Sequence, residues 1–140
     1  MDLHLFGAAT PTGEAFRQHA PNAHFTWPLH AYSRRSAVTP ADFTNPATFL
    51  PAGNPGAPAL WISFGPIWLL APFLEELALE HPERLAGLRG LIACSSSSAI
   101  TKRFAANRFD RELVARLSDA EEQLLAICRR LQVPLSLIHI

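Results

Sequence analysis

Two glycines near the start of the chain, Gly7 and Gly13, frame a short turn whose residue types suit phosphate binding. Small residues let the backbone approach a pyrophosphate, and the N–H groups that open a helix supply donors and a positive dipole end. A spacing of three residues from Gly7 places the middle glycine of such a motif at position 10, where this chain has a threonine. We expect the turn to hold a diphosphate through Gly7, Thr10, Pro11, Thr12 and Gly13. The alternative is a tight turn that binds nothing.

A second apolar run, at residues 29–33, ends in residues that could contact a ribose or a phosphate. Ser33, Arg34 and Arg35 stand there, and the run itself contains no Asp or Glu. A carboxylate at this point is typical of NAD sites, whereas an arginine accommodates the 2′-phosphate of NADP. The sequence therefore favours NADP over NAD, and Asp42 is expected to lie too far along the chain to bind the ribose. A solvated arginine pair is the alternative.

Phe64 and Gly65 close the clearest apolar run, residues 59–64, and are expected at the carboxyl end of a parallel strand. Ligands of open α/β sheets bind at that end, near the point where the strand order reverses. Gly65 would permit close approach of a nicotinamide ribose or an adenine, so both residues are candidate cofactor contacts. A simple turn is the alternative.

These residues need a parallel sheet to bring them together, and the rest of the pattern predicts one. Apolar runs alternate with helix-compatible stretches, which is typical of an α/β chain. Strands are expected at residues 3–6, 29–33, 48–50, 59–64, 90–94 and 133–140. Helices are expected at residues 13–19, 68–80 and 111–131, the last two with apolar residues at helical spacing. The prediction is a Rossmann-like, three-layer α/β/α fold with a mostly parallel sheet in the order 3-2-1-4-5-6.

Composition limits the classes of protein and partner. The chain has 140 residues, 49% of them hydrophobic, which predicts one compact domain over residues 1–140. Its formal net charge is zero, so no overall field attracts nucleic acid. The most apolar window, residues 57–74, is interrupted by prolines, which argues against a membrane span. No secretory signal is recognisable at the N-terminus, so a cytoplasmic location is expected.

The spacing of histidines and cysteines predicts no metal site. No two of the six histidines are four residues apart, as a pair of ligands on one helix would be. Cys94 and Cys128 lie in apolar runs without a second thiol or histidine at ligand spacing. We expect both to be buried free thiols.

The turn at 6–13, the segment 33–35 and the serine run 95–98 together resemble the short-chain dehydrogenase/reductase superfamily. The resemblance is to its extended or atypical branch, which includes nucleotide-sugar epimerases, and it implies NAD(P) binding. By the same analogy, Ser97 would hold the substrate oxygen as the catalytic serine, and Ser96 would line the cofactor. Family members continue into a smaller substrate-binding part, so the chain resembles a truncated member.

The catalytic pair of that family is missing. Family members carry a tyrosine and, four residues later, a lysine that lowers the pKa of the phenol for proton exchange during hydride transfer. Leu113 and Leu117 stand at the matching helix positions, while the only tyrosine is Tyr32 and the only lysine is Lys102. Without a tyrosine partner, the serine run is better explained by hydroxyls that satisfy backbone groups at a strand end.

The sequence thus leads to two functional hypotheses. The first is an NAD(P)-binding protein of the atypical dehydrogenase or epimerase type, with weak or no oxidoreductase activity and an unidentified substrate. The second is a non-catalytic interaction or sensor protein that keeps the fold without a dinucleotide. In either case the apolar strand expected at 133–140 would leave apolar surface uncovered, which predicts a homo-oligomer or poor solubility.

Overall fold

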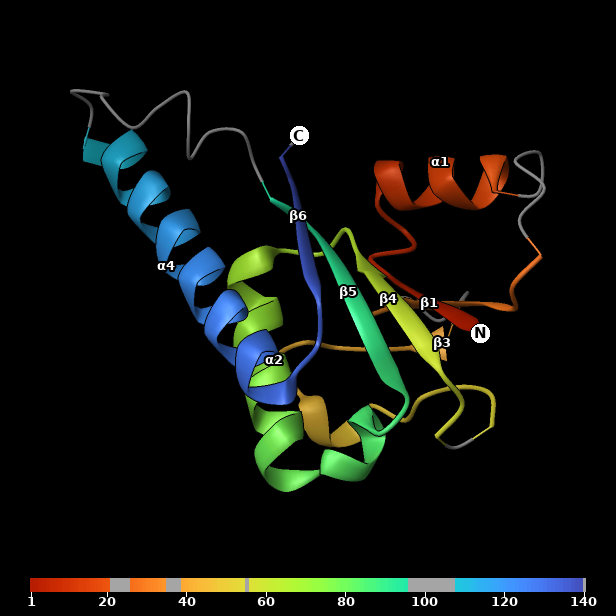
Figure 1. The fold of residues 1–140 in the computed structure, drawn as a ribbon. Coiled ribbons are helices and arrows are strands. Elements are labelled where there is room, and N and C mark those ends of the chain that lie inside the picture. The colour runs from red at the N-terminus through yellow and green to blue at the C-terminus, as the bar shows by residue number, and fades with distance from the viewer. Residues whose placement is uncertain (21–25, 35–38, 55, 96–107, 140) are drawn as a thin grey trace.

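Strands and helices alternate along most of the chain, except that the third strand follows the second, and Figure 1 shows them in a computed structural model of the protein. The structure describes residues 1–20, 26–34, 39–54, 56–95 and 108–139. The strands are β1 (Asp2–Phe6), β2 (Leu29–Ser33), β3 (Thr39–Pro40), β4 (Ala59–Ser63), β5 (Leu88–Ser95) and β6 (Leu135–His139). The helices are α1 (Pro11–His19), α2 (Ile67–Glu80) and α4 (Arg108–Leu131), with 3₁₀ turns at Pro46–Thr48 and Pro82–Leu85.

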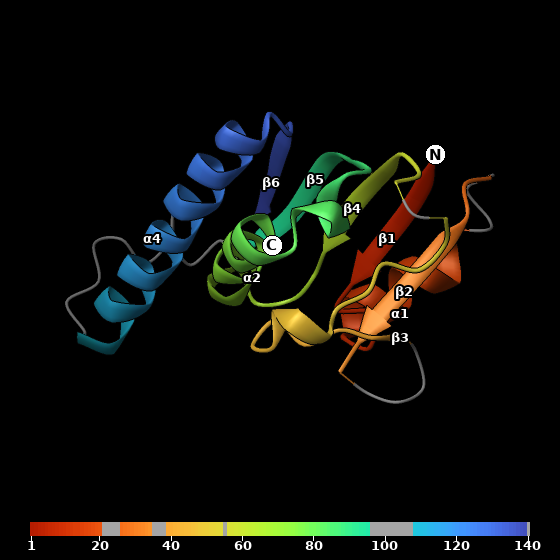
Figure 2. The same cartoon turned by 90° about the horizontal axis from the view of Figure 1, so that it is seen from below.

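The six strands run parallel in one sheet, in the order β3-β2-β1-β4-β5-β6. Figure 2 shows this succession, from β6 through β5, β4 and β1 to β2 and β3. The fold class and the strand order predicted from the sequence are therefore confirmed. Parallel strands place their carboxyl ends at one edge of the sheet, so the loops that follow neighbouring strands meet there.

The third strand is not where the sequence analysis expects it. The expected strand at 48–50 is wrong, because Pro46–Thr48 forms a 3₁₀ turn and Phe49 is a fully buried side chain beside it. The strand next to β2 is instead the two-residue β3, which pairs with the end of β2. Proline has no N–H to donate to a strand ladder, so a strand that contains Pro40 is confined to a sheet edge and stays short.

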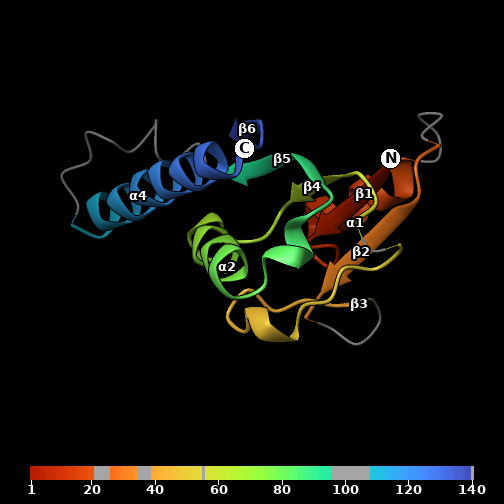
Figure 3. The ribbon, with the colours of Figure 1, turned by 60° about the horizontal axis from the view of Figure 1, so that its bottom comes forward.

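Helices cover both faces of the sheet and give three layers. The chain moves from β1 to β2 in one direction across the sheet and from β4 to β5 and β6 in the other. Right-handed crossovers therefore place the connecting helices on opposite faces. α1 packs on one face, while α2 and α4 lie side by side on the other (Figure 1, Figure 3). None of the helices in the described ranges combines the length and the apolar character that a membrane crossing requires.

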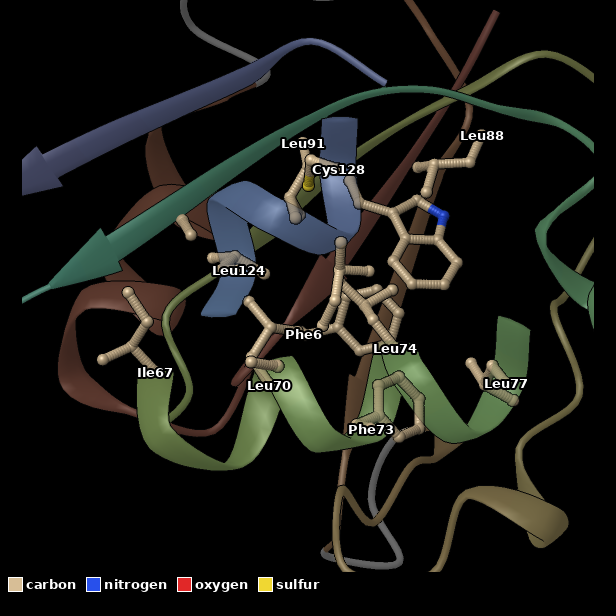
Figure 4. Close-up of a cluster of buried hydrophobic side chains, with 14 of the residues drawn as sticks. Phe6, Ile67, Leu70, Phe73, Leu74, Leu77, Leu88, Leu91, Leu124 and Cys128 are labelled. Atoms are coloured by element: carbon tan, nitrogen blue, oxygen red, sulfur yellow. The ribbon is translucent and has the colours of Figure 1, made fainter. Parts of the chain in front are cut away.

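The larger core lies between the sheet and the pair α2 and α4. Leu70, Leu74 and Leu77 recur at helical spacing, so α2 turns one apolar stripe toward the sheet. They pack in one cluster with Phe6 from β1 and Leu124 from α4, as Figure 4 shows. Burial of each such side chain contributes roughly 1.5–3 kcal/mol to folding, so this layer fixes the sheet and the loops at its carboxyl edge.

The opposite face of the sheet has a smaller core under α1, to which Phe16 contributes. Its buried residues are Leu3, Leu5, Ala8 and Ile62. Leu135 and Leu137 of β6 pack against the larger core, so the alternation of side chains turns Ile138 to this face. Ile138 is 43% exposed, and the apolar cover of the sheet is thus incomplete at β6.

Both cysteines are free thiols, as expected, although only Cys128 is fully buried and Cys94 is half-buried. Burial raises the pKa of both thiols, that of Cys128 to about 11. Neither is therefore a thiolate at neutral pH, and their contribution is to packing.

Candidate functional site

A cavity of about 560 Å³ opens at the carboxyl edge of the sheet, where β1, β2 and β4 end. Its volume is within the range of roughly 300–1,000 Å³ that small-molecule sites commonly have. Described residues that follow β1, β2, β3 and β4 line it. The lining residues are Phe6, Gly7, Ala9, Thr10, Pro11, Tyr32, Ser33, Arg34, Ala41, Asp42, Phe43, Thr44, Gly65, Pro66 and Leu69.

Many of the residues predicted to contact a cofactor line this cavity. They are Gly7, Thr10, Pro11, Ser33, Arg34 and Gly65. Thr12, Gly13 and Phe64 are not among its lining residues. Thr12 is exposed in the first turn of α1, Gly13 is buried, and Phe64 packs against Phe16 with ring centroids 6.1 Å apart. Arg35, Ser96 and Ser97 lie outside the described residues.

Gly7 and Gly13 are required by the packing of the turn itself. Gly7 has a φ of +72°, and a Cβ there would lie 2.8 Å from the backbone nitrogen of Gly65, just after β4. A Cβ on Gly13 would overlap the carbonyl oxygen of Gly7 and lie 3.0 Å from the Cα of Ala8. These neighbours are backbone atoms, so no side-chain movement relieves the contacts. The two glycines let α1 begin directly beside the ends of β1 and β4, whether or not a phosphate binds.

Thr10 caps α1 and thereby occupies groups that a phosphate would use. Its hydroxyl accepts a hydrogen bond from the Gly13 N–H at 3.1 Å and donates one to the Gly7 carbonyl oxygen at 2.6 Å. Pro11, the first helical residue, has no N–H. Of the first three residues of α1, only Thr12 therefore keeps an available N–H. The helix start retains its positive dipole end but offers fewer donors than an uncapped turn.

The cavity wall also includes the carboxylate of Asp42, which is close enough to Arg34 for the two charges to interact. β3 pairs with the end of β2 and brings Asp42 into the cavity wall. Thr44 donates hydrogen bonds to Oδ1 of Asp42 from its N–H at 2.9 Å and from its hydroxyl at 2.7 Å. These bonds, with a smaller contribution from Arg34, hold the pKa of Asp42 below its ordinary value, so the carboxylate is ionised at neutral pH. Asp42, which the sequence places too far along the chain to bind the ribose, thus lines the same cavity as Arg34, because the edge strand brings it back.

Aromatic rings form the apolar part of the wall, with Phe6, Tyr32 and Phe43 as lining residues. The Phe43 ring rests on Gly65, since a Cβ at that position would lie 2.8 Å from its Cε2. The Tyr32 hydroxyl accepts from the Ala52 N–H at 2.8 Å and lies 2.6 Å from Nδ1 of His4. Burial raises the pKa of Tyr32 to about 12. The phenol is therefore poorly matched to proton transfer at neutral pH.

The described residues offer no tyrosine–lysine pair at the cavity. Leu117 is buried in the larger core, and Leu113 packs against that core. Lys102 lies outside the described residues. Ser95, the last residue of β5, is buried, and its hydroxyl has no hydrogen-bond partner within the part of the chain that the structure describes.

Ala9, Asp42, Phe43 and Thr44 line the cavity but are not among the site residues that the sequence predicts. A signal for Asp42 and Thr44 is present, because an aspartate followed two residues later by a threonine is typical of a turn in which the carboxylate accepts from the backbone. Phe43 gives no such signal, since its position against Gly65 depends on how the loop after β3 meets the end of β4.

Comparison with known proteins adds no relative to this description. No protein-family model matches the chain, and no curated protein matches it.

Proposed function

We propose that the chain binds an adenine dinucleotide, NADP or NAD, without the hydride-transfer chemistry that is usual for short-chain dehydrogenases. The observation that carries the proposal is the 560 Å³ cavity, which joins the glycine turn, Arg34 and aromatic rings at one place. The order of strands reverses between β1 and β4, and ligands of open parallel sheets bind beside that point. The resemblance of the three motifs to the dehydrogenase/reductase superfamily supports the same class of ligand.

The cavity has groups suited to each part of such a ligand. The dipole end of α1 beside Thr10 and Pro11 suits the pyrophosphate, and the Thr12 N–H lies next to the cavity in the same helix turn. Arg34 and Asp42 suit the adenosine ribose, the first as a cation for phosphate and the second as an acceptor for hydroxyls. Because the Asp42 charge opposes that of Arg34, we expect only a modest preference for NADP over NAD. The ring of Phe43 offers an apolar face for a base.

An interaction or sensor protein that keeps the fold without a dinucleotide is the second candidate. The hydrogen bonds of the Thr10 hydroxyl and the missing N–H of Pro11 favour it, because they reduce the donors available to a pyrophosphate. In this reading, Gly7 and Gly13 are needed for packing alone.

Calorimetric titration with NADPH and NADH separates the two candidates. Binding predicts saturable heat with both, and an Arg34→Ala change should weaken NADPH roughly tenfold more than NADH, since a charge-assisted contact contributes about 1.5–3 kcal/mol. Asp42→Asn should shift the preference toward NADPH. Arg129→Ala removes an equal charge from the exposed end of α4 and serves as the control. If the folded chain gives no saturable heat with either dinucleotide, the first candidate is excluded and the second remains.

A further inference from the structure

Three side chains with metal-ligating atoms lie together on the sheet, away from the cavity. Asp2 and His4 come from the first and middle positions of β1, and His30 comes from the second position of β2. His4 lies opposite His30 in the parallel register, and Asp2 shares their face because it precedes His4 by two residues. One ligand atom from each residue lies within 4.8 Å of the other two.

We propose that Asp2, His4 and His30 bind a divalent transition-metal ion such as Zn²⁺. Two imidazoles and one carboxylate suit Zn²⁺, Co²⁺ or Ni²⁺, whereas Mg²⁺ and Ca²⁺ prefer sites made of oxygen ligands. Zn²⁺ ligands at about 2.0–2.1 Å in a tetrahedron are about 3.3 Å from one another. The distance from Oδ2 of Asp2 to Nε2 of His30 is already 3.1 Å. The ligand atom of His4 lies within 4.8 Å of these two atoms, so it has to move toward them by about 1.5 Å at most.

The surroundings of His4 are those of a metal ligand. The residue is 4% exposed, and its Nδ1 lies 2.6 Å from the Tyr32 hydroxyl. Within the described residues its Nε2 has no hydrogen-bond partner. A metal-bound histidine usually donates its other ring N–H to an oxygen that fixes the ring, and the Tyr32 hydroxyl is placed to accept it. A metal bond to Nε2 would leave Nδ1 free to keep its contact with the Tyr32 hydroxyl.

An ion can reach the site, and the loop above it leaves room. The side chains of His30 and Asp2 are 21% and 19% exposed, so solvent can deliver the ion and complete its coordination. Gly53, with a φ of +87°, lies against both residues. A Cβ on Gly53 would lie 3.1 Å from Oδ2 of Asp2 and 3.2 Å from Nε2 of His30. Glycine at this position therefore keeps the approach to the two ligand atoms open.

The spacing of the histidines along the chain predicts no metal site, because no two of them stand four residues apart as ligands on one helix would. His4 and His30 are far apart in the chain and meet only through the pairing of β1 with β2. Without an ion the same groups form one hydrogen bond between His30 and Asp2 and another between His4 and Tyr32. The experiment has to distinguish a Zn²⁺ site from this metal-free arrangement of the same side chains.

The test is calorimetric titration of Zn²⁺ into the folded protein, purified without a polyhistidine tag. We expect saturable binding of one ion per chain and no heat from Mg²⁺. His30→Ala and the isosteric Asp2→Asn should each lower the affinity more than tenfold. His81→Ala is the matched control, because it removes another partly exposed histidine beside a carboxylate, 3.7 Å from Oε1 of Glu83. It should leave Zn²⁺ affinity unchanged.

A pair of glycine variants tests the position of the ion independently. Gly53→Ala and Gly56→Ala impose a side chain on similar backbone conformations, with φ of +87° and +74°. Only the first brings a Cβ near the proposed ligands, since a Cβ on Gly56 meets nothing within 4 Å. We expect Gly53→Ala to weaken Zn²⁺ at least tenfold and Gly56→Ala to have no effect. Absence of Zn²⁺ binding by the folded chain, or binding that survives both His30→Ala and Asp2→Asn, overturns the proposal.

Discussion

Acidification from pH 7 to pH 4 should destabilise the protein through His4. Burial, and after it the charge of His30, lowers the pKa of His4 from 6.5 to about 4, while Asp2 acts in the opposite direction. The unfolded chain therefore binds a proton at this residue near pH 6.5, whereas the folded chain does so only near pH 4. Stability from the neutral imidazole is complete above pH 6.5 and is lost progressively as the pH falls to 4.

The size of the effect follows from the two pKa values. Their difference, 6.5 minus about 4, multiplied by 1.36 kcal/mol per unit, gives about 3 kcal/mol as an upper limit. The free energy of unfolding should change by at most about 1.4 kcal/mol per pH unit in this window. Since small domains have about 5–15 kcal/mol of stability in total, urea denaturation can resolve such a change.

The assay compares urea denaturation of the wild type and a His4→Gln variant between pH 4 and pH 8, in EDTA to keep metal ions away. Glutamine does not titrate and can still hydrogen-bond to the Tyr32 hydroxyl. The stability difference between the two proteins should therefore change by up to about 3 kcal/mol across the window. His19→Gln, on the exposed side of α1, should follow the wild-type curve. Parallel curves for wild type and His4→Gln would refute the reasoning that His4 is kept neutral by burial.

Three further predictions concern packing and association. Gly13→Ala should lower the free energy of unfolding by about 3 kcal/mol, because its Cβ would overlap backbone atoms. Gly56→Ala, with open space around its Cβ, should lower it by only about 1–2 kcal/mol. Equal losses in urea denaturation would contradict this. Leu124→Ala should cost about 3 kcal/mol, since this side chain is fully buried between α4 and the sheet, and a loss below about 1 kcal/mol would argue against that packing. Self-association through β6, the edge strand that carries the exposed Ile138, should be detectable by light scattering and reduced by Ile138→Lys; a wild type that stays monomeric at high concentration would exclude it.

The order of the sheet could be predicted because its signals are local and repeated. The apolar runs of β1, β2, β4 and β5 are recognisable, and the helices after β4 and β5 have apolar residues at helical spacing. Right-handed crossovers then leave few arrangements open. The strand β3 could not be predicted in the same way, because two residues that include a proline carry no periodicity.

The site was predictable where its residues follow a strand that the sequence reveals, as Gly7, Arg34 and Gly65 do. The turn at 7–13 is recognisable from its glycines, but the bonds that engage the Thr10 hydroxyl depend on backbone geometry. Asp42 reaches the cavity through the pairing of β3 with β2. His4 meets His30 through the pairing of β1 with β2. The spacing of residues within one segment does not predict these contacts between segments.

The central place of β1 has a consequence for how the protein is made. Among the strands of this sheet β1 is synthesised before the others, yet one of its two neighbours is β4, at residues 59–63. Until the ribosome has released those residues, one edge of β1 stays without a strand partner, and part of its apolar surface remains exposed to water. A nascent chain that stalls before β4 emerges would thus present an extended apolar segment to chaperones or to other nascent chains. Slow translation of the proline-rich stretch before β4 would lengthen that exposure.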